Sequence, residues 1–301
     1  MIDYTNRLGD ELAIFLLHGV VKKSEYRVRN YTRKHLEDGY FIRVLTSLKN
    51  AGTPLSLDEI LHLIIHKKPF PKKAFAITFD DGFMNNYSIA APILAEMRIP
   101  ATFYISTGMV DANAMTWIDR IEWCFEYNSK DNIRLPWEKT ARRLITRENQ
   151  IAVLDEIRRY VKSHRDVDQD RFVSFVYSEF GAKEVTKSDD PLDRKLLWDQ
   201  VSELDAHELF TIGGHAHNHE ILSFLSQNKL HRIVTTSLAY LVEKAGVETI
   251  HYSYPEGLEH CYSEPVIAEL KSNGIKICPT AIDGTNPSGC DPFHLNRIFL
   301  I

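Results

Sequence analysis

The sequence has few cysteines, and none of them stands in a paired spacing. Its 301 residues include four cysteines, Cys124, Cys261, Cys278 and Cys290. No two of them form a Cys-x-x-Cys pair, and four are too few for the disulfide scaffold of a secreted domain. A reducing cytoplasm therefore fits the cysteine usage best.

Long apolar runs and an excess of positive charge are also absent. The apolar run Leu12 to Leu17 is far too short to span a bilayer, and no basic leader precedes it. The formal net charge of −5 gives no general attraction to nucleic acid. We therefore expect a cytoplasmic protein without a transmembrane segment or a nucleic-acid partner, with a peripheral place at the inner face of the membrane as an alternative.

Apolar runs of strand length alternate with segments of helical period, which is the pattern of an α/β fold. One predicted helix begins at Ser56, with Glu59 in the spacing of a capping box. The predicted strands are Leu12 to Leu17, Ala74 to Phe79, Thr102 to Ser106, Leu209 to Gly213, Glu248 to Tyr254 and Ile275 to Pro279. Strand signals are missing from Cys124 to Asp190, where apolar residues recur at helical spacing. We therefore predict a single barrel-like α/β domain over residues 1–301, with a helical insertion at about 124–190.

Two adjacent aspartates, Asp80 and Asp81, follow the apolar run Ala74 to Phe79, and Gly82 comes directly after them. The run is typical of a strand covered on both faces. In α/β folds the groups that carry out chemistry gather at the carboxyl ends of strands. The two carboxylates are therefore candidates for a functional site.

Three histidines, His215, His217 and His219, follow the predicted strand Leu209 to Gly213. Extended backbone would place the first and third on one side. Zinc binds imidazole and carboxylate, and catalytic zinc sites combine about three protein ligands with one open position. One aspartate and two histidines would supply such a set. The competing interpretation is a loop in which the histidines bind only backbone groups.

Three segments resemble, in order, the motifs of the polysaccharide deacetylase family, the chitooligosaccharide-deacetylase-like carbohydrate esterases. They are TFDDG (Thr78–Gly82), HAHNH (His215–His219) and YPEG (Tyr254–Gly257), and the resemblance spans about Leu12 to Arg297. It implies a distorted (β/α) barrel of about seven strands and a bound divalent metal, with Zn²⁺ the expected ion. The implied activity is removal of an N-acetyl group from an amino sugar in a glycan or glycan precursor, during surface polysaccharide biosynthesis.

The same resemblance assigns a role to each member of the set. It implies that Asp80 is the catalytic base and that Asp81, His215 and His219 bind the metal. Physical chemistry agrees, because a carboxylate bound to a metal loses basicity while an unligated neighbour keeps it. Two adjacent aspartates can thus divide the two tasks.

The sequence departs from the family pattern at three positions. Ser253 stands where an arginine often pairs with the base, although Arg297 or another basic residue could replace that arginine in space. Ala216 replaces the usual hydroxyl residue between the histidines. The histidine of the family's last motif has no equivalent at the usual spacing. His294 and His18 are the candidate general acids, and either could instead be structural.

Five residues are candidates for contact with the substrate. Tyr254, Pro255 and Gly257 belong to the third motif, and Trp117 and Trp198 stand close to strand ends in the sequence. Tryptophan is more often part of a core than a platform for sugar, so a structural role is the alternative for Trp117 and Trp198.

The expected substrate is an amino sugar or oligosaccharide, lipid-linked or nucleotide-linked. A basic run would suit a phosphate or uronate on such a ligand, or would simply be solvated surface. Its members are Lys22, Lys23, Arg27, Arg29, Arg33 and Lys34. The alternatives are a formyl or non-carbohydrate amide as substrate, and a catalytically silent relative that binds a glycan or a protein.

The ligand set makes a prediction about metal content. Protein supplied with zinc or cobalt should retain a divalent ion after dialysis. The change His215→Ala should lower the affinity for the metal ion. The loss should exceed the roughly 10–100-fold that is typical when a residue hydrogen-bonded to a metal ligand is changed. Elemental analysis measures both. A protein that holds no metal, and in which His215→Ala changes nothing, would contradict the assignment.

Overall fold

The computed structural model describes residues 2–22 and 25–301. Lys23, a member of the predicted basic run, lies outside the described residues. The chain divides into two compact units: a first unit from Met1–Lys23, Lys34–Asn113 and Lys195–Ile301, and a second from Ser24–Arg33 and Ala114–Arg194. That the whole chain works as one catalytic domain stays a prediction. In the described residues, no helix is long and apolar enough to cross a membrane.

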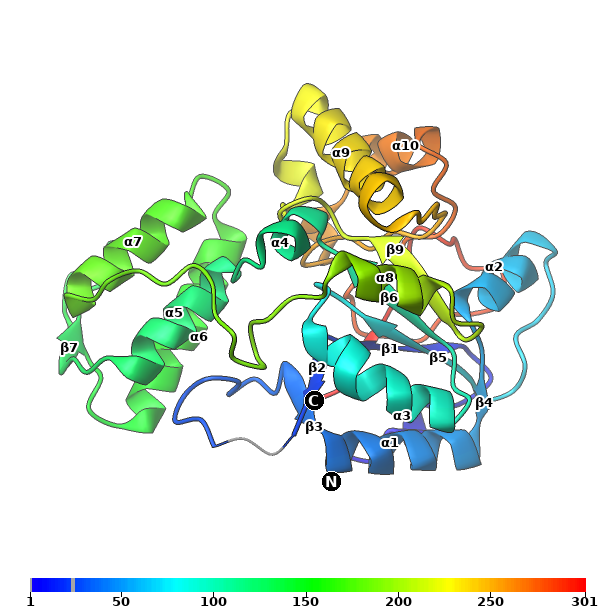
Figure 1. The fold of residues 1–301 in the computed structure, drawn as a ribbon, viewed down its shortest axis with the longest axis horizontal. Coiled ribbons are helices and arrows are strands. Elements are labelled where there is room, and N and C mark those ends of the chain that lie inside the picture. Colours follow the sequence, from blue (N-terminus) through cyan, green and yellow to red (C-terminus); the bar gives the residue numbers. More distant parts are fainter. Residues whose placement is uncertain (1, 23–24) are drawn as a thin grey trace. The chain divides into compact units, whose positions relative to one another are not determined.

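A parallel sheet forms the centre of the first unit (Figure 1). Its order is β10-β1-β5-β6-β9, with β4 paired to β5. The strands are β1 (Ala13–Leu17), β4 (Thr53–Pro54), β5 (Ala74–Phe79), β6 (Ala101–Ile105), β9 (Phe210–Gly214) and β10 (Ile298–Phe299), and β2 (Gly19–Val21) pairs separately with β3 (His35–Glu37). All pairs in the main sheet are parallel, so the carboxyl ends of its strands meet at one edge.

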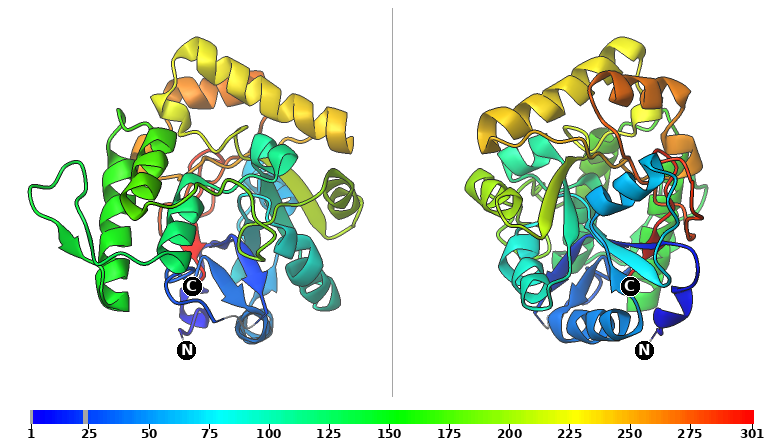
Figure 2. Two further views of the ribbon diagram at one scale, coloured as in Figure 1. Left: turned by 60° about the vertical axis from the view of Figure 1, so that its left-hand side comes forward. Right: turned by 90° about the vertical axis from the view of Figure 1, so that its right-hand side faces the viewer.

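Helices cover the sheet of the first unit. Figure 1 shows α1 and α3 along one side of it, and the views of Figure 2 agree that α9 and α10 lie side by side. The helices are α1 (Asp38–Ala51), α2 (Leu57–Ile65), α3 (Ala91–Glu96), α4 (Thr107–Ala112), α8 (Trp198–Asp205), α9 (Gln227–Ala245) and α10 (Glu264–Ser272). Shorter turns are η1 (Thr5–Arg7), the π turn η2 (Asn86–Ala90), η3 (Leu222–Phe224) and η4 (Glu259–Cys261).

Two predicted strands of the second half do not form. The segments 248–254 and 275–279 make only single parallel bridges, Gly214 with Tyr252 and His251 with Ile277. Pro255 and Pro279 follow these bridges, and proline has no backbone N–H to extend a ladder. The fold is α/β with a mainly parallel sheet, as predicted. Hydrogen-bonded strands do not close it into a ring within the described residues.

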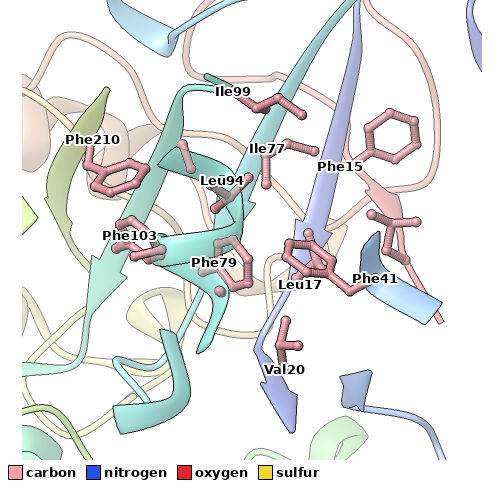
Figure 3. Close-up of a cluster of buried hydrophobic side chains, with 14 of the residues drawn as sticks. Phe15, Leu17, Val20, Phe41, Ile77, Phe79, Leu94, Ile99, Phe103 and Phe210 are labelled. Atoms are coloured by element: carbon pink, nitrogen blue, oxygen red, sulfur yellow. The ribbon is translucent and has the colours of Figure 1, made fainter. Parts of the chain in front are cut away.

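Alternate residues of β1, β5 and β6 build the main apolar cluster (Figure 3). Phe79 stacks on Phe103 with ring centres 5.1 Å apart, and Phe41 of α1 meets Phe79 edge-on. Because side chains alternate along a strand, Thr78 is directed to the opposite face. Asp80 follows it in the same alternation, and both side chains contact Arg297.

The second unit is helical, as the spacing of apolar residues predicts. It contains α5 (Trp117–Tyr127), α6 (Arg147–Ser163) and α7 (Gln169–Phe180), with a small hairpin of β7 (Asn132–Ile133) and β8 (Arg142–Arg143). Residues 154, 157 and 161 of α6 are buried in its own apolar cluster. The helices of this unit run from Trp117 to Phe180, so residues 181–190 of the predicted insertion are not helical, and the insertion itself stays a prediction.

The turn after β5 requires left-handed backbone. Asp81 and Gly82 have φ angles of 75° and 72°. A Cβ atom on Gly82 would lie 2.9 Å from Cγ2 of Val110, which is closer than real Cβ contacts allow. Glycine at this position therefore permits both the turn and its close packing.

The variant Gly82→Ala tests the cost of the left-handed turn and of the close packing against Val110. We expect its free energy of unfolding to fall by about 2–5 kcal/mol, from the left-handed backbone and from overpacking together. Gly246→Ala is the matched control, because Gly246 has a φ of 71° but open space around it. It should lose only about 1–2 kcal/mol. Equal losses in urea unfolding would show that contact with Val110 carries no cost.

Candidate active site

The structure brings Asp81, His215 and His219 together in the first unit. One ligand atom from each lies within 4.8 Å of the others. The Nε2 atoms of His215 and His219 are 3.5 and 3.3 Å from Oδ1 of Asp81. The carboxyl ends of β5 and β9 supply these residues, and β6 lies between the two strands. The predicted ligand set therefore meets in space.

The loop after β9 is not the extended segment that the sequence suggests. Ala216 and His219 have φ angles of 57° and 59°, so the backbone turns twice. The turn still places His215 and His219 on one side. His217 is directed elsewhere, with Nδ1 2.9 Å from Oγ1 of Thr107.

The donor atoms fit a divalent cation. Oδ1 of Asp81 is buried and has no hydrogen-bond partner among the described residues, which is costly for a carboxylate. Nδ1 of His215 lies 2.9 Å from the carbonyl oxygen of Ser253. Because a carbonyl only accepts, Nδ1 carries a proton, which leaves Nε2, on the side of Asp81, as the ring nitrogen that could bind a metal. One carboxylate oxygen and two imidazole nitrogens are ligands that zinc accepts.

Charges around Asp81 keep it ionised. Burial alone would raise the pKa of Asp81, but His219 and Lys34 outweigh that effect and hold the pKa well below its ordinary value. Burial lowers the pKa of His219, which favours its neutral, ligating form. Lys34 places Nζ 3.4 Å from Oδ2 of Asp81. Sequence reasoning placed Lys34 only in a basic run and missed this contact.

Arg297 binds Asp80 in the manner of the arginine that the third motif lacks. Its two terminal nitrogens each lie 2.8 Å from one carboxylate oxygen of Asp80. Arg297 is 1% exposed and also donates to Oγ1 of Thr78 at 3.2 Å. Burial alone would raise the pKa of Asp80, but Arg297 and His215 together hold it below its ordinary value. From the sequence, Arg297 was only one of several basic residues that could replace the arginine missing from the third motif.

Ser253 has a different role from the arginine it replaces. Its Oγ lies 2.7 Å from Nδ1 of His215 and 3.4 Å from Oδ1 of Asp80. Its carbonyl oxygen also contacts Nδ1 of His215. Ser253 therefore orients the imidazole of His215, whereas Arg297 orients Asp80.

Only one of the two candidate acids lies near the aspartates. His18 follows β1, and the charges of Asp81 and Asp80 act on it. Its buried Nδ1 has no hydrogen-bond partner in the part of the chain that is described. His294 is exposed and contacts Asp291 and Tyr262 instead. The structure therefore does not support the prediction of His294 as the acid.

The three residues of the third motif that were expected to touch substrate are buried. Tyr254 is fully buried, donates to the carbonyl of Phe293 at 3.1 Å and stacks on Tyr262. Pro255 and Gly257, next to it, are buried as well.

The two tryptophans are held by other residues. Trp117 belongs to the apolar cluster of the second unit. Trp198 packs beside the main cluster, and its Nε1 donates to Oδ1 of Asp111 at 3.0 Å. The structural alternative therefore describes Trp117 and Trp198 better than a sugar platform.

A double-mutant cycle measures the pair Arg297–Asp80 in metal-free protein. We expect Arg297→Met and Asp80→Asn each to lower the free energy of unfolding by about 3–5 kcal/mol, because each leaves a buried group unpaired. The double variant should lose less than the sum, with a coupling of about 1–3 kcal/mol. Arg98 and Glu208, an exposed pair 3.5 Å apart, are the control, with coupling below about 1 kcal/mol. Equal coupling in the two pairs would contradict this account.

Solved structures share the fold of this chain. IcaB from Ammonifex degensii is 17% identical, with a TM-score of 0.61 over 98% of this chain and 93% of that chain. The Streptococcus pyogenes deacetylase PplD, in complex with acetate, is 17% identical, with a TM-score of 0.61 over 97% and 93%. A de-N-acetylase from Aggregatibacter actinomycetemcomitans is 16% identical, with a TM-score of 0.61 over 96% and 94%.

A comparison by sequence identifies the family. No curated protein matches the chain. The family model described as polysaccharide deacetylase matches residues 67–278, which is more than two thirds of the chain. The match includes both aspartates and both ligand histidines. The chain therefore belongs to the polysaccharide deacetylase family.

Proposed function

We propose that this polysaccharide deacetylase hydrolyses the N-acetyl amide of an amino sugar, with Asp80 as general base. Asp81, His215 and His219 would hold a divalent cation, and zinc is the expected ion. The observation that carries the proposal is the unequal environment of the two aspartates. Asp80 is bound on both oxygens by Arg297, whereas Oδ1 of Asp81 faces two imidazoles and has no hydrogen-bond partner among the residues that the structure describes.

A divalent cation supplies Lewis-acid chemistry, since it polarises an amide carbonyl and makes water a stronger acid. The chain's own residues prepare the site for that chemistry. Asp81 and the two histidines fix three donor atoms, and Ser253 orients His215 from behind. Because these contacts exist before substrate binds, little reorganisation is needed at the moment of reaction.

Asp80 is suited to accept the proton of the attacking water. Arg297 keeps it ionised and fixes its plane, and Oδ2, which accepts one hydrogen bond from Arg297, still has a second lone pair for water. His215 Nε2 lies 3.9 Å from Oδ2 of Asp80, so the base stands beside the ligand set without belonging to it.

His18 is the group that we propose for proton transfer to the leaving amine. Burial lowers its pKa to about 4, so its imidazole is neutral at neutral pH. A neutral imidazole can accept a proton from Asp80 and transfer it to the leaving amine. It is not protonated before the reaction begins. This distinguishes His18 from a permanently protonated acid.

The family and the chemistry of the site support a proposal for the substrate class. We propose an amino-sugar oligosaccharide, lipid-linked or nucleotide-linked and made in the cytoplasm, as a precursor of a surface glycan. The related deacetylase PplD was solved in complex with acetate, which is the small product that this reaction releases.

The variant Asp80→Asn tests the division of tasks. Zinc-loaded Asp80→Asn should keep its metal while kcat for acetate release falls by about 10²–10⁴-fold, because only the base is removed. Asp81→Asn is the matched control and should lose metal first. Circular dichroism checks that each variant is folded.

Two outcomes would overturn the proposal. The first is full activity in Asp80→Asn. The second is a metal-loaded wild type that binds glycans but releases no acetate or formate from any amino sugar tested, which would identify a binding protein instead.

A further inference from the structure

An exposed aromatic ring lies beside His18 in the first unit. The centres of the Phe299 ring and of the His18 imidazole are 5.4 Å apart, with the two planes tilted by 38°. Phe299 is 39% exposed, although Ile298 and Leu300 on either side of it are buried. In the described part of the chain, the other exposed aromatic side chain is Tyr127, which belongs to the second unit. Of these two, Phe299 is the one next to a residue with a proposed catalytic role.

The register of the sheet places Phe299 on the face that carries the chemistry. Phe299 ends β10 and is paired with Leu16 of β1, which is paired in turn with Thr78 of β5. Residues paired in a parallel sheet direct their side chains to the same face, and alternation gives that face to Asp80 as well. Phe299 therefore stands at the carboxyl end of its strand, on the side of the sheet where Arg297 binds Asp80.

The distance between Phe299 and His18 matches the place that a sugar must occupy. Proton transfer from His18 to the leaving amine requires a hydrogen bond of about 2.6–3.2 Å. The amine nitrogen is bonded directly to a carbon of the sugar ring, so that carbon must come within about 5 Å of the imidazole nitrogen. The centre of the Phe299 ring lies at a comparable distance from the imidazole. A sugar with its amine at His18 therefore comes close to Phe299.

The two rings have complementary chemistry. The face of an aromatic ring carries partial negative charge, and C–H groups pack against it favourably. A pyranose ring presents C–H groups on its faces and hydroxyl groups around its edge. Contact between such a face and Phe299 also removes apolar surface from water. A single exposed phenylalanine is ordinary on a protein surface, so its position beside His18 is the observation that carries the argument.

We propose that Phe299 is a stacking platform for the substrate, which binds the C–H face of the sugar that carries the acylated amine. The inference rests on the proposed function. It favours a sugar over the non-carbohydrate amide that the sequence leaves open. Phe299 thus takes the role that Trp117 and Trp198 do not have, because those two tryptophans are held by other contacts.

Substitutions at Phe299 separate a flat ring from apolar bulk. The probe is the β-1,4-linked tetramer of N-acetylglucosamine, with zinc-loaded protein. Phe299→Leu removes the ring and keeps an apolar side chain, so KM should rise about tenfold while kcat changes by less than about threefold. Phe299→Tyr and Phe299→Trp keep a ring, so their KM should stay within about threefold of wild type. Tyr127→Leu is the matched control, because it removes an exposed ring of the second unit and should leave KM unchanged.

The division between kcat and KM distinguishes a platform from two other roles. A residue that only packs against His18 would act on proton transfer, so Phe299→Leu would lower kcat and leave KM unchanged. A residue that contacts the acyl group would change the ratio of acetate to formate released from N-acetyl and N-formyl sugars, without a change in affinity for the sugar. Either result would overturn the platform.

Calorimetry distinguishes failure of the platform from failure of the proposed function. Zinc-loaded Asp80→Asn should bind the tetramer, and adding Phe299→Leu should weaken that binding about tenfold. If the tetramer binds equally well with and without the Phe299 ring, or does not bind at all, the platform is wrong, and acetate release by wild type still decides the deacetylase. If wild type releases no acetate but binding depends on Phe299, the platform stands and the proposed function fails.

Discussion

The ion pair between Arg297 and Asp80 is the contact on which the rest of the active site depends. Arg297 directly precedes β10 and Asp80 directly follows β5, and both strands pair with β1. Burial of two charges is costly, so the pair needs good geometry and further hydrogen bonds. It has both, with two 2.8 Å contacts and a third to Thr78. The pair thus joins the last strand of the sheet to the turn that carries the chemistry.

Asp81, next to Asp80, has fewer hydrogen bonds to the protein and a less favourable backbone conformation. Asp81 keeps one buried oxygen without a hydrogen-bond partner among described residues, and its backbone is left-handed. Conformations of this kind cost free energy and persist where the surrounding structure imposes them, which is typical of functional sites. Gly82, which follows Asp81, is left-handed as well, and its close contact with Val110 leaves no room for a side chain there. Asp80 is therefore paired with Arg297 through both oxygens, whereas Oδ1 of Asp81 faces the imidazoles of His215 and His219.

Patterns of neighbouring residues in the sequence correctly predicted individual strands and a helix cap. The buried runs at β1, β5 and β6 form strands, and Ser56 with Glu59 forms the predicted capping box. The segments 248–254 and 275–279 have strand composition but make only single bridges. Their pairing depends on neighbours far away in the chain and stops at prolines, so composition alone overstates it.

The sequence by itself predicted the candidate ligand set, because Asp81, His215 and His219 follow strands whose carboxyl ends share one edge in a parallel sheet. Only the tertiary structure decided which residues support that set. Arg297 is 217 positions from Asp80, and no local spacing relates the two. The nearness of His18 to the aspartates, and the place of Lys34 beside Asp81, depend in the same way on how the strand ends and the segment before β3 come together. Contacts of this kind arise from packing of the whole chain, which a pattern of neighbouring residues does not encode.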